Sequence, residues 1–188
     1  MREEIEARVS EALSDYSFTT ENLKSLGSVL RSVASQADRG IVTISSGTRQ
    51  TDLFGNPVEN TGDYAGAIIA KNNGEFLIFT CADAVRAADS ISVTFADGVQ
   101  CAGTVKQTDE VLDMAVISVQ AGDVPDEVEE KTAVLPLGNS YVLKPGDFVV
   151  AVGGPSGMVH SVAFGMLSYV EKSVPMTDGV GRVLYGDI

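Results

Sequence analysis

The sequence predicts a mainly β fold preceded by two α-helices, and three observations carry this prediction. Nineteen glycines and no tryptophan among 188 residues suit a turn-rich β protein better than a helical bundle. Apolar residues recur with helical spacing before Gly40 and with strand spacing after it. The turn Asn72-Asn73-Gly74 separates two apolar runs, which is a pattern typical of a β-hairpin. A hydrophobic content of 44% is ample for a buried core.

Two amphipathic helices are expected within residues 1–39. The first covers 3–16, with polar residues between its apolar positions. In the second, Thr19 and Thr20 can cap the amino end, and Glu21 suits the first turn. Its apolar stripe consists of Leu23, Leu26, Leu30, Val33 and Ala37. Packing onto the β domain is the interpretation that we favour, and assembly into a homo-oligomer is the alternative.

Six strands are expected between residues 40 and 122, and they can close a small β-barrel. The strands are expected at 41–45, 65–70, 75–80, 90–95, 99–106 and 114–119. Residues 46–62 are rich in glycine, asparagine and other polar residues, so they are expected to form a loop.

An acidic connector over residues 123–134 is expected to end the first barrel. It contains Pro125 and carries five carboxylates, at Asp123, Asp126, Glu127, Glu129 and Glu130. Residues 135–188 then hold strands expected at 148–152, 159–170 and 182–185, with a glycine turn at 153–157. These strands are too few to close a second barrel.

Charge and cysteine content exclude several classes of function. A net charge of −13 argues against binding nucleic acid or anionic lipid. No apolar run approaches the roughly 20 residues of a membrane helix, so direct membrane insertion is not expected. Cys81 and Cys101 are too few for a disulfide framework and are expected to be free thiols. Neither a metal site nor a cofactor is expected, since the chain has only one histidine.

Four segments resemble trypsin-like serine proteases of the HtrA/DegP type, in the same order and spacing. They are Gly66–Ile69, Ala88–Gly98, Asp113–Ile117 and Leu135–Gly157. The resemblance implies a trypsin-like double β-barrel, of which this chain would hold the first barrel and a truncated start of the second. It also implies a place outside the cytoplasm or at the cell envelope, through an upstream anchor that is not in this chain.

The catalytic triad of that family is altered in this sequence. Thr80-Cys81-Ala82-Asp83-Ala84-Val85 resembles the family's Thr-Asn-Ala-His-Val-Val, in which the histidine is the catalytic base. Asp83 stands at the histidine position, and Asp113 matches the aspartate that orients the base. A carboxylate with an ordinary pKa of about 4 accepts a hydroxyl proton poorly. The family's Gly-Asn-Ser-Gly-Gly-Pro motif is not found before Ile188, so we expect no proteolysis.

Two further residues and one pair resemble catalytic or metal-binding groups only superficially. Ser156 lies in a sequence like a nucleophile elbow, but the last glycine and the following helix are missing, so it is interpreted as a turn residue. The single histidine, His160, is interpreted as a surface or packing residue. Asp83 and Asp113 could share a proton or attract a divalent cation. The favoured interpretation is that Asp83 points into solvent instead.

These observations leave three hypotheses of function. The first is an inactive HtrA-like scaffold that binds an extended peptide or an unfolded protein segment, or that regulates another protein. The second is the amino-terminal part of an active serine endopeptidase in protein quality control. The third is a structural module whose helices drive assembly.

Overall fold

The computed structural model describes residues 19–51, 57–154, 160–170, 173–177 and 183–187. The chain divides into two compact units, residues 1–33 and 34–188. The helix expected at 3–16 lies outside the described residues. The domain boundaries expected at residues 40, 123 and 135 stay predictions. In the described part of the chain, no helix is both long and apolar enough to cross a membrane.

The second expected helix is present as α2 (Thr20–Asp38). Its amino end is capped as the sequence predicts, because the Asn22 N–H donates to Thr19 Oγ1 at 3.3 Å. The helix ends at Asp38, and only two residues separate it from β1, which begins at Ile41. Gly40 makes this close connection possible, since a Cβ atom there would lie 2.8 Å from the carbonyl oxygen of Ala133.

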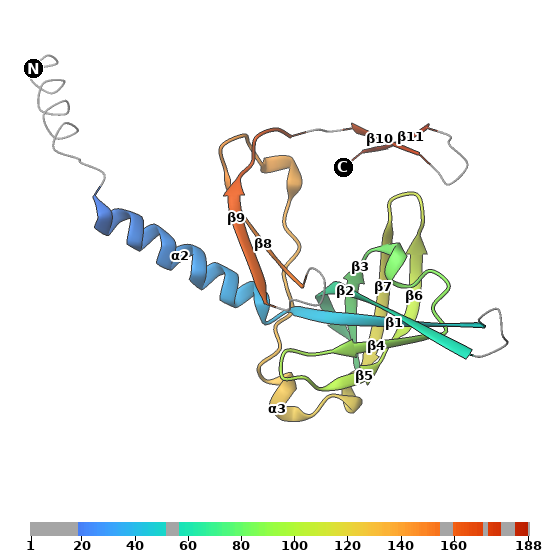
Figure 1. Cartoon of the computed structure of the whole chain (residues 1–188). Coiled ribbons are helices and arrows are strands. Elements are labelled where there is room, and N and C mark those ends of the chain that lie inside the picture. Colours follow the sequence, from blue (N-terminus) through green and yellow to red (C-terminus); the bar gives the residue numbers. More distant parts are fainter. Residues whose placement is uncertain (1–18, 52–56, 155–159, 171–172, 178–182, 188) are drawn as a thin grey trace, which may run out of the picture. The chain divides into compact units, whose positions relative to one another are not determined.

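Seven strands form one antiparallel sheet in the order β5-β4-β1-β2-β3-β7-β6 (Figure 1). They are β1 (Ile41–Thr51), β2 (Pro57–Asn72), β3 (Glu75–Thr80), β4 (Ser90–Thr94), β5 (Gln100–Ala102), β6 (Thr104–Asp109) and β7 (Met114–Gln120). The two edge strands, β5 and β6, are separated in the sequence by Gly103 alone. This short connection joins the two edge strands of the curled sheet at one end, and the expected mainly β, barrel-forming fold is confirmed.

The bend at Gly103 divides what the sequence predicted as one strand over 99–106. The Gly103 N–H donates to the carbonyl of Ile91 at 2.9 Å. A Cβ atom at residue 103 would lie 2.8 Å from Ile91 Cγ2, so a larger residue would disturb the bend. The expected hairpin turn is confirmed, because Asn73 and Gly74 have φ angles of 52° and 79°, as a tight two-residue turn requires.

The expected loop at 46–62 is wrong. β1 continues to Thr51 and β2 begins at Pro57, and the two strands stay in register from Ile41↔Ala67 to Thr51↔Pro57. The backbone ladder holds this long ribbon, and Ser45 Oγ donates to Asp63 Oδ1 across it at 2.7 Å. Its outer part lacks apolar alternation, which is why its sequence was interpreted as a loop.

The barrel core is built mainly from inward-facing apolar residues of β1, β2, β3, β4 and β7. Its buried members include Val42, Ile44, Ile68, Phe76, Ile78, Val93, Phe95, Ile117 and Val119. The acidic connector also contributes to the core. The turn η2 (Ala121–Asp123) leads into the connector. The connector forms the short helix α3 (Asp126–Glu129) and buries Val124 and Val128 against the barrel.

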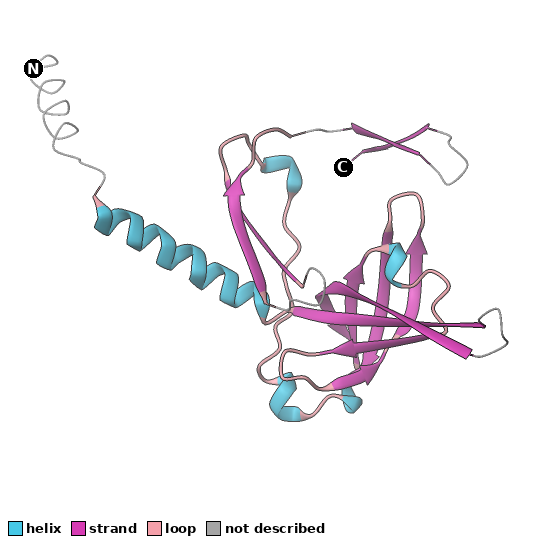
Figure 2. Cartoon of the chain, viewed as in Figure 1, coloured by secondary structure: helices cyan, strands magenta, loops and turns pink. Residues whose placement is uncertain are grey.

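After the connector come the turn η3 (Ser140–Val142) and two separate hairpins (Figure 2). The first pairs β8 (Phe148–Gly153) with β9 (Ser161–Met166), and the second pairs β10 (Ser173–Thr177) with β11 (Val183–Asp187). β10, which contains Pro175, was not among the expected strands. Within the described ranges these four strands form two-stranded sheets only.

Candidate functional site

The candidate site lies where β3 ends and the 3-10 turn η1 (Ala82–Ala84) begins. Ala82 and Ala84 are buried beneath the turn, whereas Asp83 between them is exposed. Thr80 at the end of β3 is buried, and its hydroxyl donates to the carbonyl of Ala65 at 2.9 Å. The buried alanines therefore fix the turn so that the side chain of residue 83 faces outward.

Asp113 holds this turn from the β6–β7 connection. Its Oδ1 accepts the N–H of Ala82 at 3.0 Å and the N–H of Asp83 at 3.3 Å. Its backbone is left-handed, with a φ of 51°, a conformation that aspartate adopts more readily than most residues. The connection itself is shaped by Asp109, whose Oδ1 accepts the N–H groups of Val111 and Leu112. The two predicted site residues are thus brought together, through the side chain of one and the main chain of the other.

The carboxylate of Asp83 has a different partner. Its Oδ1 lies 3.0 Å from Nη1 of Arg86, and both side chains are 57% exposed. An exposed pair of this kind contributes little to stability. Sequence reasoning missed Arg86, although an acid and a base three residues apart on a helical turn can pair. The contact supports the solvent-facing interpretation of Asp83.

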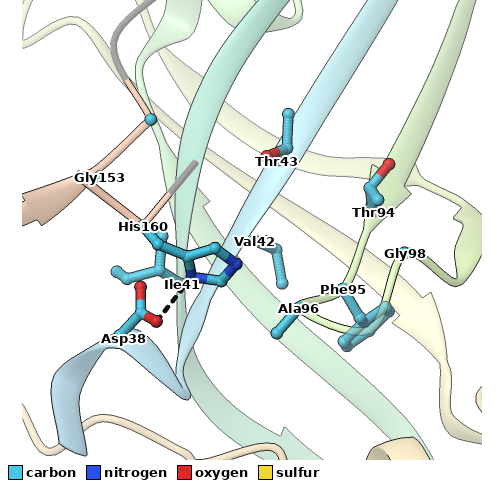
Figure 3. Close-up of a pocket in the computed structure, with 11 residues that line it drawn as sticks. Asp38, Ile41, Val42, Thr43, Thr94, Phe95, Ala96, Gly98, Gly153 and His160 are labelled. Atoms are coloured by element: carbon cyan, nitrogen blue, oxygen red, sulfur yellow. Dashed lines mark hydrogen bonds and ion pairs between the residues drawn. The ribbon is translucent and has the colours of Figure 1, made fainter. Parts of the chain in front are cut away.

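His160 lies in a different place. It directly precedes β9, and its Nδ1 lies 2.6 Å from Oδ2 of Asp38, at the end of α2 (Figure 3). The pair forms one wall of a cavity of about 110 Å³, whose other walls come from β1, the turn after β4 and the end of β8. Neither Asp83 nor Asp113 lines this cavity. Sequence reasoning missed Asp38, which is 122 residues away from its partner.

Both cysteines are free thiols. Cys101 is buried, and its Sγ–H donates to the carbonyl oxygen of Asp123 at 3.3 Å. Burial raises the pKa of the Cys101 thiol, and the charge of Asp123 raises it further. A protonated, buried thiol is a packing group rather than a nucleophile. Among the described residues, no three His, Cys, Asp or Glu side chains are grouped so that they could hold a metal ion.

The fold is a small curled antiparallel barrel. A 3-10 turn follows its third strand, and an aspartate just before its last strand clamps this turn. Together these features define a trypsin-like scaffold. The comparison with protein families agrees, because a model described as "Trypsin-like peptidase domain" matches residues 65–185, more than half of the chain. The chain belongs to this family, and its relatives are of the HtrA/DegP type.

Three relatives show the extent of the similarity. HhoA of Synechocystis sp., whose name describes a serine protease, is 38% identical over 114 residues, which cover 60% of this chain and 26% of HhoA. A DegP-like protein of Hahella chejuensis, named as a periplasmic serine endoprotease, is 34% identical over 65% of this chain and 25% of its own length. Serine protease Do-like HtrA of Bacillus subtilis is 30% identical over 65% of this chain and 26% of its own. The chain thus spans about a quarter of the length of these relatives.

Solved structures show the same fold. The HtrA-type protease AlgW with a decapeptide has a TM-score of 0.60 and 16% identity, and the match covers 84% of this chain and 55% of that one. A variant of AlgW with a tripeptide has a TM-score of 0.58 and 20% identity, over 74% of this chain and 40% of that one. The likeness extends beyond the first barrel, because 84% of the chain is more than the barrel alone.

Proposed function

We propose that this chain is a proteolytically inactive HtrA-type scaffold that binds an extended peptide or an unfolded protein segment. The observation that carries the proposal is the residue on the clamped turn. A serine-protease triad needs an imidazole beside the orienting aspartate. Asp113 accepts hydrogen bonds from the turn at residues 82 and 83, yet the side chain of residue 83 is a carboxylate paired with Arg86.

The loss of the base is expected to have a large effect on catalysis. Removal of the histidine or serine of such a triad costs on the order of a million-fold in turnover. A carboxylate does not replace the imidazole, because its pKa is several units too low to accept a hydroxyl proton near neutral pH. The chain's own histidine has Asp38 as its partner, and it lines a cavity whose lining does not include Asp113.

Binding of a peptide is supported by the shape of the scaffold. Two solved AlgW structures that share its fold contain a decapeptide and a tripeptide. Extended peptides bind such sheets by adding a strand to an exposed edge. β8 and β9 form a two-stranded sheet and so offer edges of this kind, and Phe148 and Phe164 on them are 58% and 62% exposed. We place this binding outside the cytoplasm, as the name of the Hahella relative suggests for that protein.

A second candidate is that the chain is one part of an active serine endopeptidase. The observation that favours it is the length of the relatives named as serine proteases, of which this chain spans about a quarter. This candidate requires a base other than Asp83.

One experiment separates the two candidates. The full product of the natural gene is treated with a fluorophosphonate probe, which labels activated serines, beside its Asp83→His and Asp83→Asn variants. The proposal expects wild type and Asp83→Asn to remain unlabelled. Labelling of the wild type would overturn the proposed inactivity. Peptide binding is measured separately, by fluorescence anisotropy with a library of extended peptides and wild-type protein that was not treated with the probe. If no peptide binds, the proposed binding is overturned.

A further inference from the structure

Asp38 occupies an electrostatically unfavourable position. It is the last residue of α2, and no basic residue lies in the last turn of that helix. The carboxyl end of a helix carries a partial negative charge, so a carboxylate there is destabilising unless a cation lies beside it. In addition, Oδ1 of Asp38 is buried and has no hydrogen-bond partner among the described residues. Two independent features therefore favour a positive charge beside this side chain.

His160 is the group that lies there. Its Nδ1 approaches Oδ2 of Asp38 to 2.6 Å, and Figure 3 shows the ring turned toward the carboxylate. The backbone of His160 has a φ of 63°, in the left-handed region that side-chain-bearing residues rarely adopt. Such a conformation persists where surrounding contacts hold it. The backbone and the ring thus both indicate that the contact with Asp38 fixes this residue.

The contact joins two parts of the second compact unit. His160 directly precedes Ser161, which pairs with Gly153 at the end of the β8–β9 hairpin. Gly153 itself faces the barrel, because a Cβ atom there would lie 3.7 Å from Cβ of Ala65 on β2. The cavity that Asp38 and His160 close on one side lies between the hairpin end and the barrel. Loss of the contact would therefore free this end of the hairpin and widen the cavity.

We propose that Asp38 and His160 form a protonation-sensitive latch, which holds the end of the β8–β9 hairpin on the first barrel. With a protonated imidazole, the latch is an ion pair that also compensates the carboxyl end of α2. With a neutral imidazole, it is a hydrogen bond without the charge attraction, and the hairpin end opens more often. Charge-assisted hydrogen bonds are about twice as strong as neutral ones, which is the physical basis of the difference.

The charged side chains around the latch mostly have hydrogen-bond or ion-pair partners of their own. The guanidinium of Arg39 donates to the carbonyl oxygens of Lys131, at 2.7 Å, and of Glu130, at 3.3 Å. Asp97 pairs with Nζ of Lys131 at 2.9 Å, and this hydrogen bond raises the pKa of Lys131. The remaining carboxylate of this corner, that of Glu130, lines a neighbouring cavity that Asp38 also lines.

The other elements at the cavity bring no titratable side chain. β1 and β4 contribute Thr43 and Thr94, and the end of β8 contributes Gly153 and Gly154. The intervening sequence 155–159 contains no ionisable residue. An imidazole ordinarily titrates near about pH 6.5, whereas carboxylates titrate near about pH 4. His160 is the only histidine of the chain, so a response carried by an imidazole would come from this residue.

Hydrogen–deuterium exchange of the whole chain tests the latch. Exchange of peptides covering 148–166 is compared at about pH 5.5 and about pH 8, after correction for intrinsic rates. Peptides covering β7 serve as the internal reference. For wild type we expect the opening of the hairpin end to be about five-fold more frequent at the higher pH. Equal opening at the two pH values would overturn the proposal.

Two substitutions of the same residue give matched controls. His160→Gln removes the charge at every pH, so the hairpin end should open equally often at both pH values. His160→Lys keeps a positive charge at both, so the end should stay closed at both, with the same cost for a left-handed backbone. A pH dependence that survives in His160→Gln would assign the change to another group and contradict the latch.

A measurement on the folded wild type does not depend on these variants. The chain has one histidine, so its ring protons give unique signals in a proton NMR spectrum. Asp38→Asn should shift these signals at about pH 5.5, because it removes the charge next to the ring. Identical ring signals in wild type and Asp38→Asn would show that the contact does not exist in solution.

Discussion

The first barrel and the β8–β9 hairpin have similarly apolar strands but opposite burial. In the barrel, Ile44, Ile78 and Ile117 are each 0% exposed. In the hairpin, Phe164 and Met166 are 62% and 64% exposed, although β8 and β9 contain almost only apolar residues and glycine. The difference lies in curvature, because a curled seven-stranded sheet encloses its inner side chains, whereas a two-stranded sheet has no second layer. Composition therefore predicts which residues can be buried, and topology decides which are.

Truncation of a large side chain is expected to give the largest difference in stability between the two regions. Ile117→Ala should lower the free energy of unfolding by about 2–5 kcal/mol, because it leaves a cavity in a closed core. Phe164→Ala should change it by less than about 0.5 kcal/mol, because the ring is mostly exposed. Urea unfolding followed by circular dichroism measures both. A similar loss for the two variants would mean that the hairpin is covered in solution, and the comparison would fail.

The addition of one methyl group sharpens the same comparison. A Cβ atom at Gly66 in β2 would lie 2.7 Å from both Ile44 Cδ1 and Ile78 Cγ2, whereas a Cβ atom at Gly165 in β9 would meet nothing within 4 Å. Gly66→Ala should therefore cost about 1–3 kcal/mol through overpacking. Gly165→Ala should be neutral or stabilise by a few tenths of a kcal/mol, because alanine lowers the entropy of the unfolded chain.

The two Gly→Ala variants are compared by their urea midpoints, with m-values checked for constancy. If Gly66→Ala left the midpoint unchanged, the core around Ile44 would have to be loose enough to accept a methyl group. A loss of stability in Gly165→Ala as large as in Gly66→Ala would show that β9 is packed against something.

The barrel was predicted well from sequence because its signals are local. β3 (Glu75–Thr80) has the expected bounds, since the two-residue turn at Asn73 and Gly74 fixes where it starts. Prediction failed where pairing with a neighbouring strand, rather than the residues themselves, makes a segment a strand. The outer part of β1 is polar, and it is held mainly by its backbone ladder with β2. β10 contains Pro175, which a sequence pattern assigns to a non-strand region.

The candidate site was predicted only in part. Asp83 and Asp113 could be named because a family motif marks their positions, and their assigned triad roles stay predictions. The hydrogen bonds from Ala82 and Asp83 to Asp113 depend on the left-handed backbone of Asp113, which no sequence pattern specifies. The contact of Asp38 with His160 could not be predicted, because it joins residues 122 positions apart through another left-handed backbone.

The clamp of Asp113 on the turn gives the third prediction. Asp113→Ala should lower the free energy of unfolding by about 1–2 kcal/mol, because two N–H groups lose their acceptor and alanine disfavours a positive φ. Asp113→Asn should cost less, since asparagine keeps an acceptor oxygen and tolerates the left-handed region. Thermal unfolding of the three proteins ranks them. Equal stability of Asp113→Ala and wild type would show that the clamp does not hold the turn, and the site geometry would have to be revised.

The smallest expected effect is on the pH dependence of stability, and it distinguishes the barrel from the hairpin by the pH at which each changes. In the barrel, Glu75 on β3 accepts hydrogen bonds from Lys106 on β6, at 2.9 Å, and from Gln120 on β7, at 2.6 Å. The hydrogen bond from Lys106 is the main cause that lowers the pKa of Glu75 below 4.5, against a smaller opposing effect of burial, and Gln120 lowers it further. Because the pKa is lower in the folded state, the stabilisation is fully present above the unfolded-state pKa. It is lost as the pH falls through the lowered value.

The melting temperature of wild type and of Glu75→Gln, measured from about pH 6 down to about pH 3, tests this assignment. Wild type should be slightly more stable at the upper end, and the two curves should converge toward the lower end. Curves that stay parallel would remove Glu75 as a source of pH dependence. The barrel thus responds in acid through a carboxylate bridging three strands, whereas the hairpin end is proposed to respond near neutral pH through one imidazole. A single pH series that records melting and hairpin exchange together should therefore show two separate transitions, and their coincidence would mean that barrel and hairpin open as one unit.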